Sequence, residues 1–249
     1  MAIIENGSLR GQVGNLVNRR VGTQHIVQTK PGRKIRQTKS TQVAAEDFGY
    51  ASAAGALLRQ AFVHTHQQLH DDKMHNRLIK HIQRVMWSDP APIVGYSSIR
   101  EGNIDRLIGF QFNADCHLQD YLYIDPVVRI NDEQQVSVCF SAFHRHKHLR
   151  IPKDCYHVVF QVETIALQFG DKKIFPLGTQ EIEIEIYAGK ENRIDEQILT
   201  FEDPVHPYDS ILVGLCILYV DKSGSRSYVR NNKELHPAAI IGGFNRRPA

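Results

Sequence analysis

The spacing of apolar residues changes twice along the chain and divides it into three stretches. Residues 1–40 show no sustained helical period and contain five glycines and one proline, so we expect extended segments and turns there. Residues 41–92 place apolar side chains three and four positions apart, which is typical of helices. After Pro92 the period falls to two, which indicates strands.

Two helices are expected in the middle stretch, and we predict that they form a helical hairpin. The first lies between Val43 and Leu69. The second begins at a cap provided by Asp71 or Asp72 and continues to Met86. The prolines that follow within residues 88–92 should end it, because proline has no N–H to donate to a continuing helix.

The third stretch alternates most clearly over Glu181–Tyr187, where isoleucines and glutamates take opposite faces of the expected strand. Ile211–Val220 is almost wholly apolar and should be a central strand, followed by a hairpin turn at 221–224. The remaining strand-like runs are Leu107–Asn113, Tyr121–Ile130, Gln135–Phe143, His157–Phe169, Gln197–Phe201 and Ser227–Val229. Because no helical pattern interrupts them, an antiparallel sandwich is favoured over a parallel α/β sheet.

These patterns predict a mainly β protein with an N-terminal α-helical segment. Residues 1–40 form an extended, basic, glycine-rich arm, and residues 41–92 form the helical segment. Residues 93–249 form an antiparallel, immunoglobulin-like β-sandwich region of one or two sandwiches, with a possible division near 170–180.

Charge is distributed unevenly between the arm and the rest of the chain. Residues 1–40 hold eight basic side chains and one acid, a balance of +7. Since the whole chain carries +3, the remaining 209 residues carry −4. A basic arm on an acidic body can bind nucleic acid, or it can bind the body of a neighbouring copy.

The arm supplies the candidate site residues. The basic contact residues are Arg19, Arg20, Lys30, Arg33, Lys34, Arg36 and Lys39. The aliphatic residues expected to provide an assembly surface are Leu9, Val13, Leu16, Val17, Val21, Ile26 and Val27. The arm contains no aromatic residue on which bases could stack, so contact with nucleic acid would be made through phosphates.

No catalytic motif is present, and we expect neither an enzyme nor a cofactor. The stretch R-G-Q-V-G-N at 10–15 resembles a phosphate loop only superficially, because no apolar strand precedes it and no lysine motif follows. Three histidines at 144, 146 and 148, and two at 66 and 70, have spacings that could hold a metal. Interleaved arginine and lysine favour a basic solvated loop at 144–148, so we assign no metal site, although metal binding there stays open.

Four scattered cysteines, without a C-x-x-C pair, are typical of free thiols in a reducing compartment. No apolar run has the length of a signal peptide or a membrane span. We therefore expect a cytoplasmic protein.

The N-terminal pattern Gly7-x-x-x-Gly11-x-Val13-Gly14-Asn15, followed by a basic stretch and an alanine-rich helix, resembles a family of uncharacterised Bacteroidota proteins. The apolar strand Ile211–Tyr219 and the hairpin after it are similar to the end of the same family. The resemblance implies a β architecture with a C-terminal sandwich region, and it implies no activity.

The leading hypothesis is therefore a non-enzymatic structural or interaction protein that self-assembles, or docks on a larger complex, through its arm. A homo-oligomer is the expected form. The alternative is a nucleic-acid-associated protein that uses the basic residues of the arm for phosphate contacts.

Overall fold

The computed structural model describes residues 2–5, 7–21, 23–30, 37–88, 99–131, 135–187, 192–202 and 210–245. The chain forms two compact units, residues 1–42 and residues 43–249.

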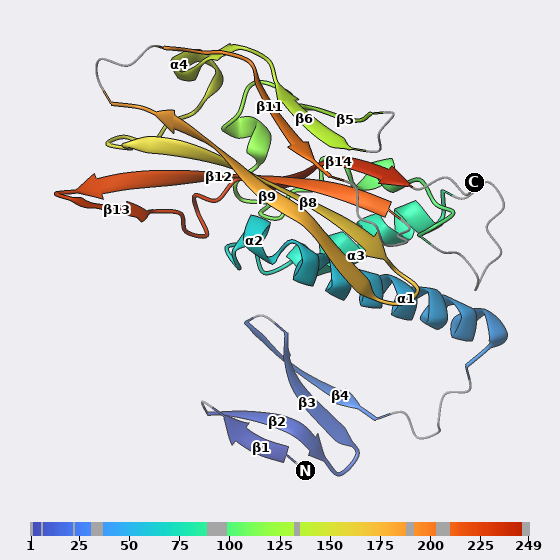
Figure 1. Ribbon diagram of the computed structural model, residues 1–249. Coiled ribbons are helices and arrows are strands. Elements are labelled where there is room, and N and C mark those ends of the chain that lie inside the picture. The colour runs from blue at the N-terminus through green and yellow to red at the C-terminus, as the bar shows by residue number, and fades with distance from the viewer. Residues whose placement is uncertain are drawn as a thin grey trace. The chain divides into compact units, whose positions relative to one another are not determined.

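Unit 1 contains a four-stranded antiparallel sheet in which each strand pairs with the next along the chain. Its strands are β1 (Ala2–Glu5), β2 (Ser8–Val13), β3 (Leu16–Val21) and β4 (Gln24–Thr29). Of the extended segments and turns expected over residues 1–40, those between Ala2 and Thr29 are joined into one sheet (Figure 1). We call it the N-terminal sheet. Residues 31–36 lie outside the described residues, and the predicted boundary at residue 40 is two residues late, because helix begins at Lys39.

The helices follow the 3.6-residue pattern of the middle stretch. They are α1 (Lys39–Ala61), α2 (Val63–His66) and α3 (Met74–Met86). Asp71 accepts a hydrogen bond from the backbone N–H of Lys73 at 2.9 Å, just before α3 begins. The helix ends at Met86, and the prolines expected to end it lie outside the described residues.

The strands of unit 2 form two main antiparallel sheets. The five-stranded sheet contains β8 (His157–Gln168), β9 (Lys173–Glu185), β12 (Ser210–Ser223), β13 (Arg226–Val229) and β14 (Ala238–Asn245). Its order is β13-β12-β8-β9, and β14 pairs with β12 on the same side as β13. The three-stranded sheet has the order β11-β6-β5, with β5 (Val127–Ile130), β6 (Val136–Phe140) and β11 (Gln197–Phe201).

Short elements complete unit 2. They are the 3₁₀ helices η1 (Ile104–Leu107) and η2 (Leu118–Asp120), the one-turn helix α4 (Arg145–His148), and the paired two-residue strands β7 (Phe143–His144) and β10 (Arg193–Ile194).

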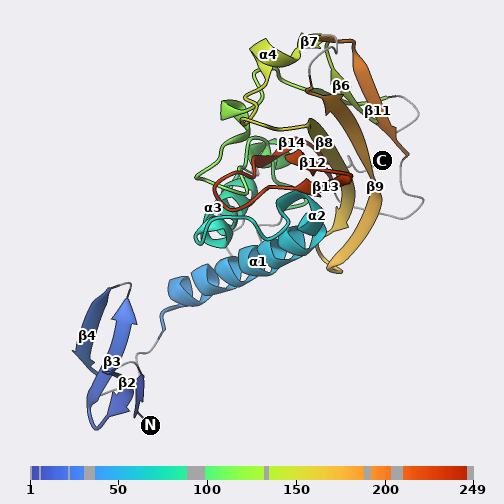
Figure 2. The same cartoon turned by 90° about the vertical axis from the view of Figure 1, so that its left-hand side faces the viewer.

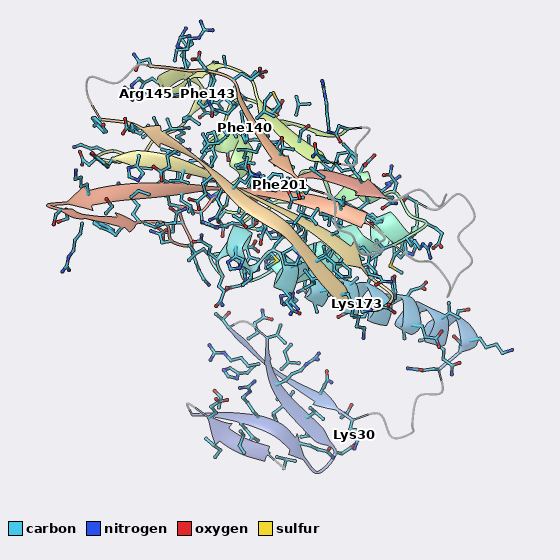
Figure 3. The ribbon with its side chains drawn as sticks, viewed as in Figure 1. Lys30, Phe140, Phe143, Arg145, Lys173 and Phe201 are labelled. Carbon is cyan, nitrogen blue, oxygen red and sulfur yellow. The ribbon has the colours of Figure 1, made fainter. Side chains whose placement is uncertain are left out.

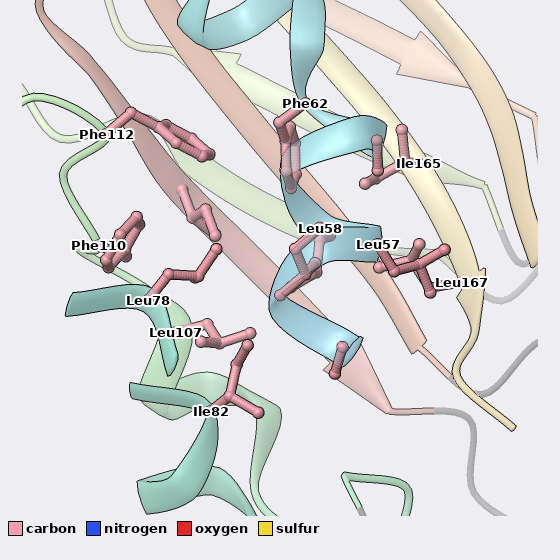
Figure 4. Close-up of a cluster of buried hydrophobic side chains, with 14 of the residues drawn as sticks. Leu57, Leu58, Phe62, Leu78, Ile82, Leu107, Phe110, Phe112, Ile165 and Leu167 are labelled. Atoms are coloured by element: carbon pink, nitrogen blue, oxygen red, sulfur yellow. The ribbon is translucent and has the colours of Figure 1, made fainter. Parts of the chain in front are cut away.

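Unit 2 is built in three layers around β12, whose residues from Ser210 to Val220 are all buried (Figures 1 and 2). Leu212, Cys216 and Leu218 face the helices, while the alternate residues of β12 face the three-stranded sheet. Figure 4 shows the helix side, where Leu58 of α1 and Phe62, which lies between α1 and α2, pack among Leu78, Leu107 and aromatic side chains. On the opposite side Phe160 stacks on Phe143 and packs at a tilt against Phe140.

Gly214 of β12 allows the helices to approach the sheet closely. A Cβ at this position would lie 2.7 Å from Phe62 Cε1 and 2.9 Å from Thr65 Oγ1, well inside normal contact distance. The absence of a side chain therefore lets Phe62 and Thr65 of α2 pack directly on the strand.

The prediction of two strands is wrong over most of their length. Leu107–Asn113 begins at the last residue of η1 and continues as a loop, in which Gln111 forms a single bridge to Ala239. In Tyr121–Ile130 only the last four residues form a strand. Both stretches are apolar because they cover the core as loops, and period-two spacing alone does not distinguish this from a strand.

Strand β14 is absent from the sequence-based assignment. Its residues are AAIIGGFN, in which small residues and glycines hide the alternation of a strand. The possible division near 170–180 falls in the β8–β9 hairpin, where Gln168 pairs with Lys173 within one continuous sheet.

We expect Ile184→Ala in β9 to lower the free energy of unfolding by about 2–5 kcal/mol, because Ile184 is 1% exposed and faces the three-stranded sheet. The neighbouring change Glu183→Ala should cost no more than about 0.5 kcal/mol, because Glu183 is exposed. Urea unfolding measures both. Equal losses would contradict the assignment of the two faces.

We also expect a chain that begins at Thr41 to unfold cooperatively, because the buried residues of both cores begin at Ala51. Thermal unfolding followed by near-UV circular dichroism checks this. Loss of the near-UV signal would mean that residues 1–40 are needed to complete the fold of unit 2.

Candidate assembly surface

The motif Gly-x-Val-Gly-Asn forms a tight hairpin in the N-terminal sheet. Val13 pairs directly with Leu16, so Gly14 and Asn15 make a two-residue loop between β2 and β3. Gly14 has a φ of +56°, and glycine with positive φ at the first loop position is typical of a type II′ turn. The stretch that resembles a phosphate loop is thus a hairpin turn, and it fixes the register of β2 and β3.

The pairing register assigns the aliphatic residues of the β2–β3–β4 region to two faces. Val13, Leu16 and Val27 share one face, because Val13 pairs with Leu16 and Val27 pairs with Asn18, two residues beyond Leu16. We call this the Leu16 face. Val17, Val21 and Ile26 lie on the opposite face. Leu9 pairs with Ile4 in the β1–β2 hairpin.

The N-terminal sheet has no core among its described residues, since none of them is buried. On the Leu16 face, Val13 is 49% exposed, Leu16 44% and Val27 59%. On the opposite face Val21 is exposed, while Val17 and Ile26 are half-buried. Sheets in proteins are normally stabilised by packing at least one face against another layer, so this sheet presents an apolar surface suited to a partner.

The basic residues of the sheet are divided between its two faces. Arg19 pairs with Ile26 and Arg20 pairs with His25, so these two adjacent arginines have opposite orientations. Arg10 forms an ion pair with Glu5 at 2.5 Å, with both side chains about half exposed. Ion pairs of this kind contribute little to stability.

The other basic residues lie at the end of the sheet and beyond it. Lys30, labelled in Figure 3, donates a hydrogen bond to the side-chain oxygen of Gln12 at 3.4 Å. Lys39 is the first residue of α1. Arg33, Lys34 and Arg36 lie outside the described residues.

The histidine-rich stretch after β7 forms α4, a single turn of helix. His144 and His148 have ring centroids 6.4 Å apart, and the Nδ1 atom of His148 accepts a hydrogen bond from the backbone N–H of His144. Arg145, labelled in Figure 3, is buried and donates to the carbonyl of Glu185 and the side-chain oxygen of Asn192. Within the described part of the chain, no group of three or more metal-ligating side chains gathers.

A buried polar network that the sequence-based analysis missed joins α2 to β8. Glu163 is 5% exposed, and its carboxylate accepts hydrogen bonds from the backbone N–H and hydroxyl of Thr65 at 3.1 and 2.6 Å. The carbonyl of Thr65 lies 2.8 Å from Nε2 of His236, whose Nδ1 lies 3.0 Å from the side-chain amide of Asn231. A glutamate inside the apolar run of β8 is the sequence signal that could have revealed this network.

Burial shifts the pKa values of this network in opposite directions. It raises the pKa of Glu163, against the opposing effect of the Thr65 hydrogen bonds, and it lowers the pKa of His236. Both shifts favour the neutral forms. The hydrogen bonds of the network attach α2 to the sheet. This structural role accounts for its buried polar groups, and we assign the network no catalytic role.

No family model, curated protein or solved structure matches this chain. Among the described residues, no helix is both long and apolar enough to cross a membrane.

We predict that Glu163→Gln leaves the protein at least as stable as the wild type at pH 7, because it removes the cost of burying a charge and keeps an acceptor for Thr65. A raised pKa means that the stability supplied by Glu163 is complete below the ordinary pKa of glutamate and is lost as the pH rises through the raised value. The advantage of the glutamine variant should therefore grow with pH.

Glu163→Ala is the control, and it should lower the free energy of unfolding by about 1–3 kcal/mol by leaving Thr65 without its acceptor. Urea unfolding across pH 4–8 measures both variants. A difference between the glutamine variant and the wild type that does not change with pH would contradict the assignment.

Proposed function

We propose that this chain is a non-enzymatic structural protein that self-assembles, with the N-terminal sheet of one copy packing on unit 2 of another. The observation that carries the proposal is the sheet itself, whose aliphatic side chains line both faces while no described residue in it is buried. Covering one such face with another protein layer would release water from aliphatic surface, which contributes about 25 cal/mol per Å² buried.

The proposed partner is a second copy because the two parts of the chain have complementary charge. Residues 1–40 carry +7 and the remaining residues carry −4. Opposite net charges accelerate the encounter of two surfaces and disfavour wrong partners, while aliphatic burial supplies most of the affinity. A homo-oligomer therefore matches both the exposed aliphatic faces of the sheet and the positive charge of residues 1–40, without requiring a second protein.

Nucleic acid is the alternative partner, supported by the density of arginine and lysine in residues 1–40. The opposite orientation of Arg19 and Arg20 favours this alternative less, because one face of the sheet would bring only part of the charge to a phosphate backbone. A cytoplasmic location and an immunoglobulin-like classification of the two packed sheets stay predictions.

Replacing Leu16 and Val27 together by serine should make the protein monomeric, because it removes two exposed aliphatic side chains from the Leu16 face. Replacing Arg19 and Arg20 together by glutamine should weaken assembly only modestly, since exposed charges contribute little net affinity. Light scattering over a range of protein concentrations, at low and high salt, gives the mass of each variant.

A matched control replaces Val17 and Val21 by serine, which likewise removes two aliphatic side chains, from the opposite face. Assembly that survives this control but not the Leu16/Val27 change identifies the covered face. A wild-type protein that stays monomeric at every concentration would refute the proposal. Assembly that survives the serine changes but is lost with the arginine changes, together with steeply salt-dependent binding to DNA or RNA, would favour the alternative.

A further inference from the structure

Unit 2 contains an apolar groove beside β14, which we call the β14 groove. Its volume is about 270 Å³, and its aliphatic lining comes from Ile108 after η1, from Leu118, Leu122 and Ile124 in and after η2, and from Ile240 and Ile241 of β14. Ile108 is 44% exposed, so the groove has an apolar rim open to solvent.

The walls of the groove are held together by backbone hydrogen bonds. The N–H of Gly109 donates to the carbonyl of Ile240 at 2.8 Å, and the N–H of Ile240 donates to the carbonyl of Phe110 at 3.0 Å. Gly109 has a φ of +84°, a backbone conformation that favours glycine, and it faces open space, since a Cβ there would meet no atom within 4 Å. The groove is therefore formed before any partner binds.

The size and polarity of the groove suit aliphatic side chains better than a cofactor or a substrate. Pockets for small ligands usually measure about 300–1,000 Å³ and combine apolar walls with a few convergent polar groups. Here the side chain of Gln111 already forms internal hydrogen bonds, accepting from the N–H of Leu118 at 2.8 Å and donating to the carbonyl of Gly109 at 3.1 Å. A protruding aliphatic side chain needs no such polar partner.

The groove lies in an acidic part of the chain. Residues 104–126, which form most of its wall, contain four aspartates and one arginine, a balance of −3. Asp125 is itself a lining residue. A partner that fits this surface should be basic and should present exposed aliphatic side chains, and the N-terminal sheet has both properties.

We infer that the β14 groove receives aliphatic side chains from the Leu16 face of the N-terminal sheet of a second copy. The inference rests on the proposed function and adds the receiving surface to it. One copy would contribute its sheet and the other its groove, so the interface would be heterologous, with different surfaces on the two partners.

The direct test places a charge at the rim of the groove. Ile108→Arg adds a cation that repels the basic sheet and is costly to bury, so the dissociation constant for assembly should rise at least roughly tenfold. Ile198→Arg makes the same change at a residue that is 60% exposed on β11 and does not line the groove, and it should leave assembly unchanged. Ile108→Ser, without a charge, should weaken assembly less and serves if the arginine variant does not fold.

A mixing experiment distinguishes this inference from the proposed function. The Leu16→Ser/Val27→Ser chain keeps its groove, and the Ile108→Arg chain keeps its sheet. At a protein concentration where the wild type assembles but a tenfold weaker interface does not, neither variant should assemble alone. An equimolar mixture should form heterodimers, because one intact sheet meets one intact groove. Native mass spectrometry identifies the heterodimer by the masses of its two chains.

Each outcome has a defined meaning. If the serine variant is monomeric while Ile108→Arg assembles like the wild type, the groove is not the receiving surface and the proposed function stands. If neither change affects assembly, the inference is overturned, and the proposed function fails as well if the Val17→Ser/Val21→Ser control also assembles like the wild type. If both variants are monomeric and the mixture forms no heterodimer, the sheet and the groove do not bind each other and the inference is overturned.

Discussion

The fold of unit 2 depends on burying both faces of the strand pair β8 and β12. The alternate residues of β12 contribute to two different cores, with Leu212 and Leu218 facing the helices and Ile211 and Ile217 facing the three-stranded sheet. Burying one such side chain contributes about 1.5–3 kcal/mol, so neither face can be left open to water without a large loss. Three layers are the direct consequence.

The helix layer is held on this sheet by close packing and by hydrogen bonds. Gly214 leaves the space that Phe62 occupies, and Glu163 on the neighbouring strand accepts both hydrogen bonds from Thr65. Glu163 and Gly214 are paired across β8 and β12, so the two features act at the same place on the sheet. A buried carboxylate needs such partners because leaving it without hydrogen bonds would be costly. The position of α2 is therefore specified by a combination of close packing and polar complementarity.

The N-terminal sheet also has apolar side chains that are stabilised by burial, but within the described residues of unit 1 none of them is buried. Neighbouring strands of the sheet are paired and its hairpin at Gly14 is tight, so the backbone hydrogen bonds between adjacent strands are formed. What is missing is a layer that covers its aliphatic side chains. This difference between a sheet with both faces buried and a sheet with neither face buried is the physical basis for proposing assembly. The acidic, apolar groove beside β14 has the matching properties on unit 2.

The sequence by itself determined the features that depend on local periodicity. The isoleucine and glutamate alternation correctly placed Ile182 and Ile184 in the core and their glutamate neighbours in solvent, and the apolar run at 211–220 correctly predicted the central strand. Helix α3 follows its 3.6-residue pattern from Met74 to Met86. These features were predictable because each residue's environment repeats along a single element.

Only the tertiary structure decided the features that depend on distant pairing. Strand β14 forms because its small residues fit beside β12, while Leu107–Asn113 stays a loop because it covers the core and bridges to β14 at one point. The partnership of Thr65 with Glu163 joins residues 98 positions apart. The opposite orientation of Arg19 and Arg20 follows from strand pairing, and the groove is formed by three segments that meet only in the fold. Local spacing carries no information about such contacts, because they arise from which elements the chain brings together.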